Sequence, residues 1–348
     1  MSLETFGRHA TIPVFVPHAA CPNQCVFCNQ RKISGRESFD LNSVSLEIEN
    51  ALSTVDSNDE VEIAFFGGSF TGIDRTLMVS LLEIAHSYIL EGRVGSIRCS
   101  TRPDYIDEEI LSILKKYGVK TIELGLQSTS ARVLENAKRG HNFEAELKSC
   151  RMIVENGFDL VGQMMIGLPS SDIESEIRTA EFITSVGAVG ARIYPTVVFR
   201  DTELCDMTLS GSYTPLSLED AIERSARVLE IFIDGGVEVI RIGLQSSENL
   251  SSGDSYVAGP NHSALGELVI GEVYYNKISK KLLDRNLKGD KNILVLVSRG
   301  SMSKAVGQNK RNKLRLNERY KNLSFSEADG ISDYEILLEI NNGEIKCI

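Results

Sequence analysis

The chain has 348 residues, of which 42% are hydrophobic and 24% charged, and its formal net charge is −11 at pH 7. This composition is typical of a folded globular protein and excludes a wholly disordered chain, and the negative charge argues against a surface devoted to nucleic acid. No apolar run approaches the roughly 20 residues of a membrane helix, and no basic and apolar leader opens the chain, so we expect a cytoplasmic protein without a membrane partner. The seven cysteines lack the spacing of a disulfide framework, which fits a reducing compartment.

Helix and strand patterns alternate along the first two thirds of the chain, after an apolar run at residues 12–16. Apolar residues at helical spacing predict helices at 43–54, 76–90, 107–117, 130–137, 144–156, 171–186 and 218–233. Short apolar runs predict strands at 61–66, 96–101, 121–126, 159–166, 191–195 and 237–242. This alternation indicates an α/β protein with a parallel sheet, and polar motifs after most strands favour a partial barrel over an open sheet.

The pattern weakens after residue 242. A loop at 245–259, a helix at 267–285, a strand at 292–297, a polar and basic segment at 301–312 and a strand at 334–340 are predicted there. We therefore predict a catalytic core at residues 1–245 and a small α+β extension at residues 246–348.

Three cysteines lie close together near the start of the chain, with the spacing C-x3-C-x2-C: Cys21, Cys25 and Cys28. Three thiolates this close in sequence can converge on one centre, and soft sulfur ligands select zinc, copper(I) or an iron–sulfur cluster. An ordinary cluster takes four cysteines, so three leave one metal position open for chemistry. Zinc completed by His18 is the alternative.

This cysteine spacing, with Phe27 before the last cysteine, resembles the radical S-adenosylmethionine (SAM) superfamily. The resemblance implies a partial (β/α)6 barrel in which Cys21, Cys25 and Cys28 hold a [4Fe–4S] cluster. It also implies that SAM chelates the fourth iron and is cleaved to a 5′-deoxyadenosyl radical, with an external reductant such as flavodoxin or ferredoxin. Phe27 is then expected beside the cofactors.

Two further motifs resemble SAM contacts of this superfamily. Gly67 and Gly68 match a Gly-Gly-Glu-like segment that binds the SAM amino group, with Ser69 where many members have Glu. Gln127 and the downstream Arg139 resemble SAM contacts of oxygen-independent coproporphyrinogen oxidase and of the elongator catalytic subunit. An arginine can hold a carboxylate with two parallel hydrogen bonds.

Two polar residues at other strand ends complete the predicted cofactor site. Ser100 stands where the elongator subunit has Glu, and Gln163 stands where the coproporphyrinogen enzyme has Asp. Strand alternation puts Arg192 and Tyr194 on one face, toward the barrel lumen, and we predict both as catalytic or substrate residues. The segment around them also resembles the elongator subunit.

The segment from Lys304 to Lys321 has seven basic residues and one acidic residue, a local net charge of +6. The simple interpretation is that this segment forms a solvated, charged surface. The more specific interpretation is that it binds RNA through the phosphates.

The resemblance covers roughly the first 270 residues, and the acetyltransferase domain of the elongator subunit is not expected here. We hypothesise a radical SAM enzyme with an unidentified substrate, for which tRNA is one candidate. The alternatives are an oxidase of a porphyrin or another small molecule and, in a different class, a zinc- or cluster-bearing RNA-binding protein without catalysis.

Overall fold

The computed structural model describes residues 9–16, 25–28, 39–56, 59–244, 255–287 and 291–341. Internal contacts divide the chain into two compact units: Met1–Leu216 with Phe232–Pro260, and Ser217–Ile231 with Asn261–Ile348. The boundary at residue 245 stays a prediction. Within the described residues, no helix is both long and apolar enough to span a membrane.

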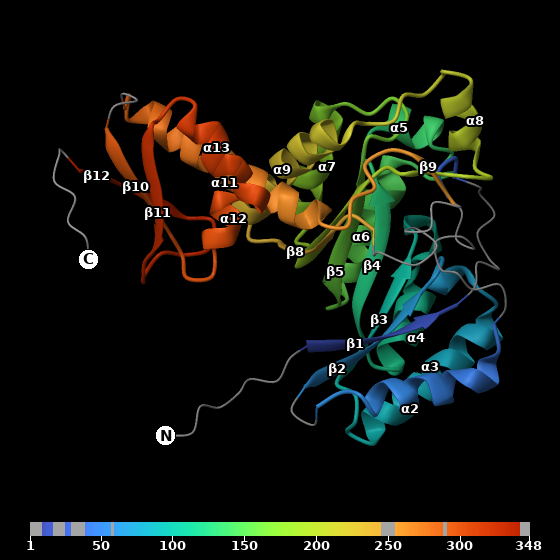
Figure 1. Ribbon diagram of the computed structural model, residues 1–348. Helices are drawn as coiled ribbons and strands as arrows, with labels where there is room; N and C mark the ends of the chain where they lie inside the picture. Colours follow the sequence, from blue (N-terminus) through green and yellow to red (C-terminus); the bar gives the residue numbers. More distant parts are fainter. Residues whose placement is uncertain are drawn as a thin grey trace, which may run out of the picture. The chain divides into compact units, whose positions relative to one another are not determined.

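The first unit is built on a curled sheet of seven parallel strands in the order β1-β2-β3-β4-β5-β6-β8 (Figure 1). The strands are β1 (His9–Phe15), β2 (Glu60–Phe66), β3 (Ser96–Thr101), β4 (Val119–Gln127), β5 (Asp159–Ile166), β6 (Gly190–Pro195) and β8 (Glu238–Ile242). The predicted α/β partial barrel is confirmed, and the apolar run near residue 12 forms its first strand.

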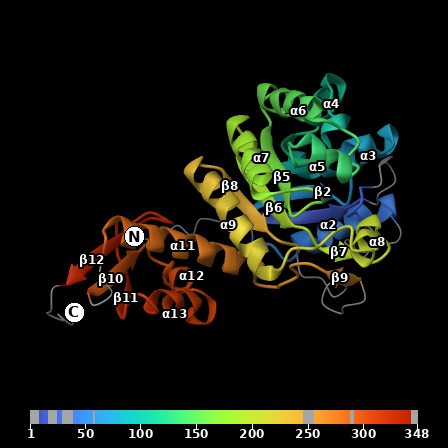
Figure 2. The ribbon, with the colours of Figure 1, turned by 90° about the horizontal axis from the view of Figure 1, so that it is seen from above.

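Helices follow most of these strands: α2 (Val44–Leu52), α3 (Arg75–Leu90), α4 (Glu108–Lys116), α5 (Ala131–Asn136), α6 (Phe143–Glu155) and α7 (Ile173–Ser185). Figure 2 shows α3, α4, α6 and α7 on the outer side of the curled sheet. A side chain placed just before the first turn fixes the start of several of them. Asp107, for example, accepts the Ile110 N–H at 2.8 Å, which satisfies one of the unpaired donors at the start of α4.

The sheet has an apolar outer face and a polar inner face, because successive strand side chains point to opposite faces. On the outer face Ile97 and Ile122 are fully buried beneath the helices. On the inner face, Glu62, Arg98 and Glu123 occupy the alternate positions of β2, β3 and β4. The fold therefore lines its lumen with charged side chains.

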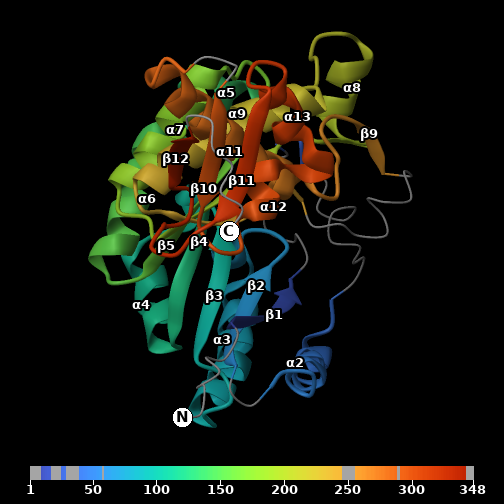
Figure 3. The same ribbon diagram turned by 60° about the vertical axis from the view of Figure 1, so that its left-hand side comes forward.

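Shorter elements lie at the end of the sheet toward which β3 and β4 point, where α5 and α8 (Glu203–Leu209) are seen (Figure 3). A two-stranded antiparallel ribbon joins β7 (Val198–Phe199) to β9 (Tyr256–Ala258). The loop predicted at 245–259 is wrong at β9, because backbone pairing with β7 orders that segment; residues 245–254 lie outside the described residues.

The second unit contains most of α9 (Leu218–Asp234), α11 (Leu265–Asp284), α12 (Met302–Val306) and α13 (Arg311–Asn317). Its sheet has the order β11-β10-β12, with β10 (Asn292–Val297) parallel to β11 (Asn322–Glu327) and antiparallel to β12 (Ile336–Asn341). Tyr274, Ile278 and Leu282 of α11 pack with the buried residues of this sheet. Helices α12 and α13 and strand β11 were not predicted from the sequence.

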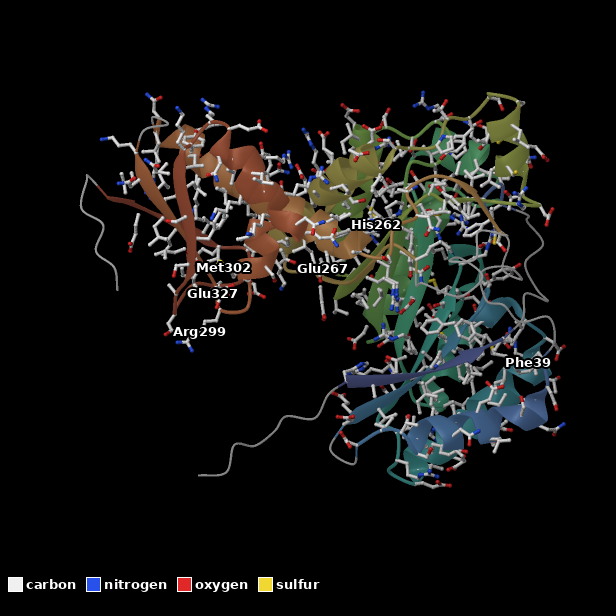
Figure 4. The ribbon with its side chains drawn as sticks, viewed as in Figure 1. Phe39, His262, Glu267, Arg299, Met302 and Glu327 are labelled. Atoms are coloured by element: carbon white, nitrogen blue, oxygen red, sulfur yellow. The ribbon has the colours of Figure 1, made fainter. Side chains whose placement is uncertain are left out.

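Figure 4 shows Arg299, Met302 and Glu327 together at one end of this small sheet. The Glu327 Oε1 accepts the backbone N–H of Gly300 at 3.0 Å and of Met302 at 3.1 Å. His262, near the start of α11, accepts the Ala264 N–H on its Nδ1 at 3.1 Å and so supports a local turn.

Candidate active site

The described part of the cysteine motif is a tight turn at residues 25–28. The Cys28 N–H donates to the Cys25 carbonyl oxygen at 2.9 Å, and Cys25 is only 5% exposed. Phe27 is half-buried and packs against Val133, Ala137 and Leu168. Cys21 and His18 lie outside the described residues, so the third ligand of the motif stays a prediction.

Two neighbouring segments hold this turn through its backbone. The Val26 N–H donates to the Ala137 carbonyl oxygen at 3.2 Å, and the Leu204 N–H donates to the Val26 carbonyl oxygen at 2.8 Å. Lys138 and Glu203, which adjoin those two partners, form an ion pair at 2.6 Å. The cysteine turn is therefore fixed between the end of α5 and the start of α8.

Two buried arginines approach the Cys25 sulfur. The Arg139 Nη1 lies 3.2 Å and the Arg102 Nη1 lies 3.9 Å from Cys25 Sγ. Arg139 also donates to the Gly125 carbonyl oxygen, and Arg102 donates to the Arg139 carbonyl oxygen. Arg102 was not predicted as a site residue, because a guanidinium before Pro103 and Asp104 is equally typical of a surface turn.

Gln127 stands at the end of β4 in a left-handed conformation, with φ at 72°. The register of β4 with β5 shifts between Gly125 and Gln127, which bends the strand end and re-aims the side chain. A Cβ at Gly125 would lie 3.0 Å from the Gln127 Nε2 and 3.5 Å from the Arg139 Nη2. Glycine at residue 125 therefore lets the Gln127 and Arg139 side chains both approach its backbone closely.

Two polar atoms in this corner are buried and have no hydrogen-bond partner among the described residues: Gln127 Oε1 and Arg139 Nε. One is an acceptor and the other a donor. Buried polar groups are normally paired, so this pair of atoms fits a ligand that carries both an ammonium and a carboxylate group. The methionine part of SAM has this chemistry.

The Gly-Gly motif lies where β1 and β2 end side by side. Gly67 has φ at 105°, and a Cβ there would come within 2.5 Å of the Val16 carbonyl oxygen. No other residue fits that approach without displacing the backbone. Ser69 follows at 6% exposure, and Gly68 separates it from Gly67.

Ser100, Gln163 and Arg192 meet around Glu123 in the lumen. Ser100 Oγ and Gln163 Nε2 donate to the Glu123 Oε2 at 3.1 and 2.8 Å, and Arg192 Nη2 donates to its Oε1 at 2.7 Å. Tyr194 Oη lies 3.5 Å from the Arg192 Nη1. These four predicted residues therefore come together, but around Glu123, a carboxylate that was not predicted from the sequence.

Arg98 extends this lumen network to a second carboxylate. It donates to Glu123 at 3.0 Å and to Glu62 at 2.8 Å. Burial alone would raise the pKa of Glu123, but Arg192 and Arg98 outweigh burial and lower it. Charged residues inside apolar strands are the sequence signal that would have identified Glu62, Arg98 and Glu123.

A second buried cluster lies behind Arg139. The His141 Nε2 is 3.0 Å from the Glu146 Oε1, and its Nδ1 is 3.7 Å from the Asp104 Oδ1. Burial raises the pKa of Glu146 to about 9, and burial together with the Arg139 charge lowers the pKa of His141 to about 3. Both groups are thus neutral at pH 7, with the protonated carboxyl group able to donate to the imidazole.

The predicted basic segment forms η4 (Gln308–Lys310) and α13 in the second unit. Arg315 is already engaged there: its guanidinium is 2.6 Å from Glu272, and its Cζ lies 3.5 Å from the centre of the Tyr275 ring. Lys310, Arg319 and Lys321 are exposed. Arg315 therefore serves the packing of α13 on α11.

Comparison with protein families agrees with this geometry. The model of the Radical SAM superfamily matches residues 15–183, and the Radical_SAM C-terminal domain matches residues 188–275. The chain belongs to the radical SAM superfamily. Members of this superfamily bind a [4Fe–4S] cluster and SAM and cleave SAM reductively.

Curated relatives include the tRNA uridine(34) acetyltransferase of Methanocaldococcus jannaschii, which is 25% identical over 264 residues, or 64% of this chain and 48% of the relative. Human elongator complex protein 3 is 28% identical over 62% of this chain and 42% of the relative. The chain spans about half the length of the curated relatives it matches. The predicted likeness to the elongator catalytic subunit is confirmed.

Among solved structures, an archaeal Elp3 from Methanocaldococcus infernus with an N-terminal deletion gives a TM-score of 0.62 at 23% identity, over 82% of this chain and 65% of that one. This likeness supports the radical SAM barrel as the fold.

The pH dependence of stability should report the state of Glu146. Between about pH 4.5 and 9, unfolding releases the Glu146 proton, so a rise in pH lowers the free energy of unfolding. His141 binds a proton on unfolding below about pH 6.5 and offsets this effect there. Above pH 6.5 the offset from His141 disappears, and the Glu146 contribution amounts to up to about 1.4 kcal/mol per pH unit.

Urea denaturation between pH 6.5 and 8.5 measures this slope. Glu146→Gln, which cannot ionise, should lose much of the decline seen in the parent protein. Glu144→Gln, an exposed change on the same helix, is the control and should retain it. Equal slopes in the parent and in Glu146→Gln would contradict a neutral Glu146.

Proposed function

We propose that this radical SAM enzyme holds its cluster on Cys21, Cys25 and Cys28 and cleaves SAM to a 5′-deoxyadenosyl radical that modifies tRNA. One observation supports the cluster and SAM part of this proposal most strongly. The buried Cys25 sulfur lies 3.2 Å from Arg139, beside unpaired donor and acceptor atoms on Arg139 and Gln127. Arg139 would donate to a metal-bound thiolate at Cys25, and the unpaired atoms of Gln127 and Arg139 would bind an amino acid ligand.

When bound, the cluster supplies the electron that cleaves the sulfonium of SAM. The residues of this chain would bind and orient SAM for that event. Gln127 Oε1 would accept from the SAM ammonium group, and Arg139 Nε would donate to its carboxylate. The backbone at Gly67, Gly68 and Ser69 would approach the same end of SAM, and Phe27 would cover the site from water.

The lumen network would then face the substrate. Arg192 and Tyr194 project from β6 onto the same inner face as Glu123, Ser100 and Gln163. The paired charges leave a polar, hydrogen-bonding surface, which suits a polar substrate group such as a nucleobase edge. A porphyrin or another small molecule is the alternative substrate for this lumen.

The relatives favour tRNA over a small molecule, because one of them is named as a tRNA uridine(34) acetyltransferase. The basic segment from Lys304 to Lys321 gives a second reason. Its charge would be attracted to phosphates, and Lys310, Arg311 and Lys313 stand on one short stretch of it. Arg315 is left out of the proposed contact, since it binds Glu272. A flavodoxin or ferredoxin of the cytoplasm would supply the electron.

The first prediction concerns the cluster. Protein reconstituted without oxygen should bind about four irons and four sulfides per chain, and changing Cys21, Cys25 or Cys28 to Ala should abolish that binding. Iron, sulfide and zinc analysis with visible spectroscopy provides the measurement. Cys205→Ala is the control, because Cys205 packs beside Val26 yet lies outside the motif. Stoichiometric zinc without a chromophore would refute the cluster.

The second prediction concerns SAM. Gln127→Gly suits the left-handed backbone and removes the unpaired acceptor, so SAM should bind about 10- to 100-fold more weakly, the loss of one charged hydrogen bond of roughly 1.5–3 kcal/mol. Anaerobic calorimetry on cluster-loaded protein measures this. Ser170→Gly, at another left-handed residue, should bind SAM normally. Gln127 is preferred to Arg139 for this test because Arg139 also contacts Cys25. Unchanged affinity in Gln127→Gly would remove Gln127 from the site.

The third prediction concerns RNA. Changing Lys310, Arg311 and Lys313 together to Glu should weaken tRNA binding and lower the slope of log affinity against log salt by about 2, or about 0.7 per lost phosphate contact. Changing Lys115, Lys116 and Lys120 to Glu alters net charge equally and serves as the control. If both triple variants bind tRNA alike at low salt, docking through this segment is wrong, and a small molecule becomes the leading substrate.

A further inference from the structure

Arg102 is buried at the end of β3 and is held from two sides. It is 4% exposed, and its Nε and Nη2 each donate to one oxygen of Asp104 at 2.9 Å. Its Nη2 also donates to the Arg139 carbonyl oxygen. Pro103 stiffens the turn that brings Asp104 back beneath the guanidinium. The side chain is thus fixed by its neighbours.

The Nη1 of this guanidinium lies on the side of the cysteine turn. It lies 3.9 Å from Cys25 Sγ, a distance that is long for a hydrogen bond but short for an interaction between charges. Arg139 Nη1 lies 3.2 Å from the same sulfur. Asp104 binds the far side of Arg102, so the positive end of this ion pair faces the sulfur.

A positive charge beside a metal-bound thiolate stabilises the electron-rich state of the centre. Net charge and hydrogen bonds to the sulfurs are among the factors that set the reduction potential of an iron–sulfur cluster. Burial strengthens the effect, because little water screens the charge. Arg102 meets these conditions at Cys25 without itself being required to bind SAM.

We infer that Arg102, oriented by Asp104, raises the reduction potential of the centre held by Cys25 and so eases its uptake of an electron. The inference rests on the proposed cluster. Arg102 is a positioning and tuning residue, and Arg139 remains the predicted SAM contact. The redox change is the transfer of one electron from an external reductant to the centre, with no bond made or broken.

The experiment is an anaerobic potentiometric titration of the reconstituted full chain with dithionite, followed by electron paramagnetic resonance. In Arg102→Gln the equilibrium constant for reduction should fall about tenfold, which for a one-electron couple is a shift of about 59 mV to lower potential. The double variant Arg102→Gln/Asp104→Asn also removes the opposing negative charge. Its potential should lie between those of Arg102→Gln and the parent.

Arg93→Gln is the matched control, since it removes one guanidinium from an exposed ion pair with Glu49 and changes net charge equally. It should keep the parent potential. The inference is overturned if Arg102→Gln retains four irons at the parent potential, or if both Arg102 variants lose the cluster that Arg93→Gln keeps. A parent chain that assembles no cluster would instead overturn the proposed function, and this inference with it.

Discussion

The parallel direction of all seven strands is the constraint on which the site depends. Parallel strands bring their carboxyl ends to one edge, so residues far apart in sequence become neighbours there. Gly67, Arg102 and Gln127 each follow or end a different strand, and Arg139 comes from the connection after one of them. The cysteine turn contributes no strand of its own and is fixed at this edge by the backbone of Ala137 and Leu204.

Charge inside the barrel imposes a second constraint. In the lumen, Arg98 and Arg192 form ion pairs with Glu62 and Glu123, and such pairing offsets the high cost of burying an isolated charge. Arg98 bridges Glu62 and Glu123, while Arg192 binds Glu123 from β6. Such buried pairs add little net stability, but each fixes the rotamer of its partners. The lumen therefore has a defined shape, since few of its side chains can move alone.

The sequence predicted the regular parts of this fold well. Strands at 96–101 and 159–166 match the structure at both ends, because apolar runs bounded by turn residues are a strong local signal. Short elements such as α8 and β9 were missed, since they depend on contacts from elsewhere in the chain. The local sequence pattern does not predict contacts between segments that are far apart in the sequence.

The site was predictable in part for a related reason. Cys25, Gln127 and Arg139 were found because their spacing resembles that of a family. Glu123 was not predicted, although a carboxylate inside an apolar strand is a signal of a buried charged site. Arg102 resembled half of a surface pair with Asp104, and only the fold brings it close to Cys25. The local sequence pattern of one strand does not identify the partner of a buried charge, because that partner lies on another strand.

Helix α9 is shared between the two compact units, with residues 218–231 in one and residues 232–234 in the other. The chain thus enters the second unit, returns to the barrel for residues 232–260, and then enters the second unit again. On the ribosome, the first segment of that unit emerges before the barrel has its last strand. The last strand of the first unit is therefore synthesised when most of α9 is present but residues 261–348 of the second unit are not. The two units thus cannot complete their folding one after the other in the order of synthesis.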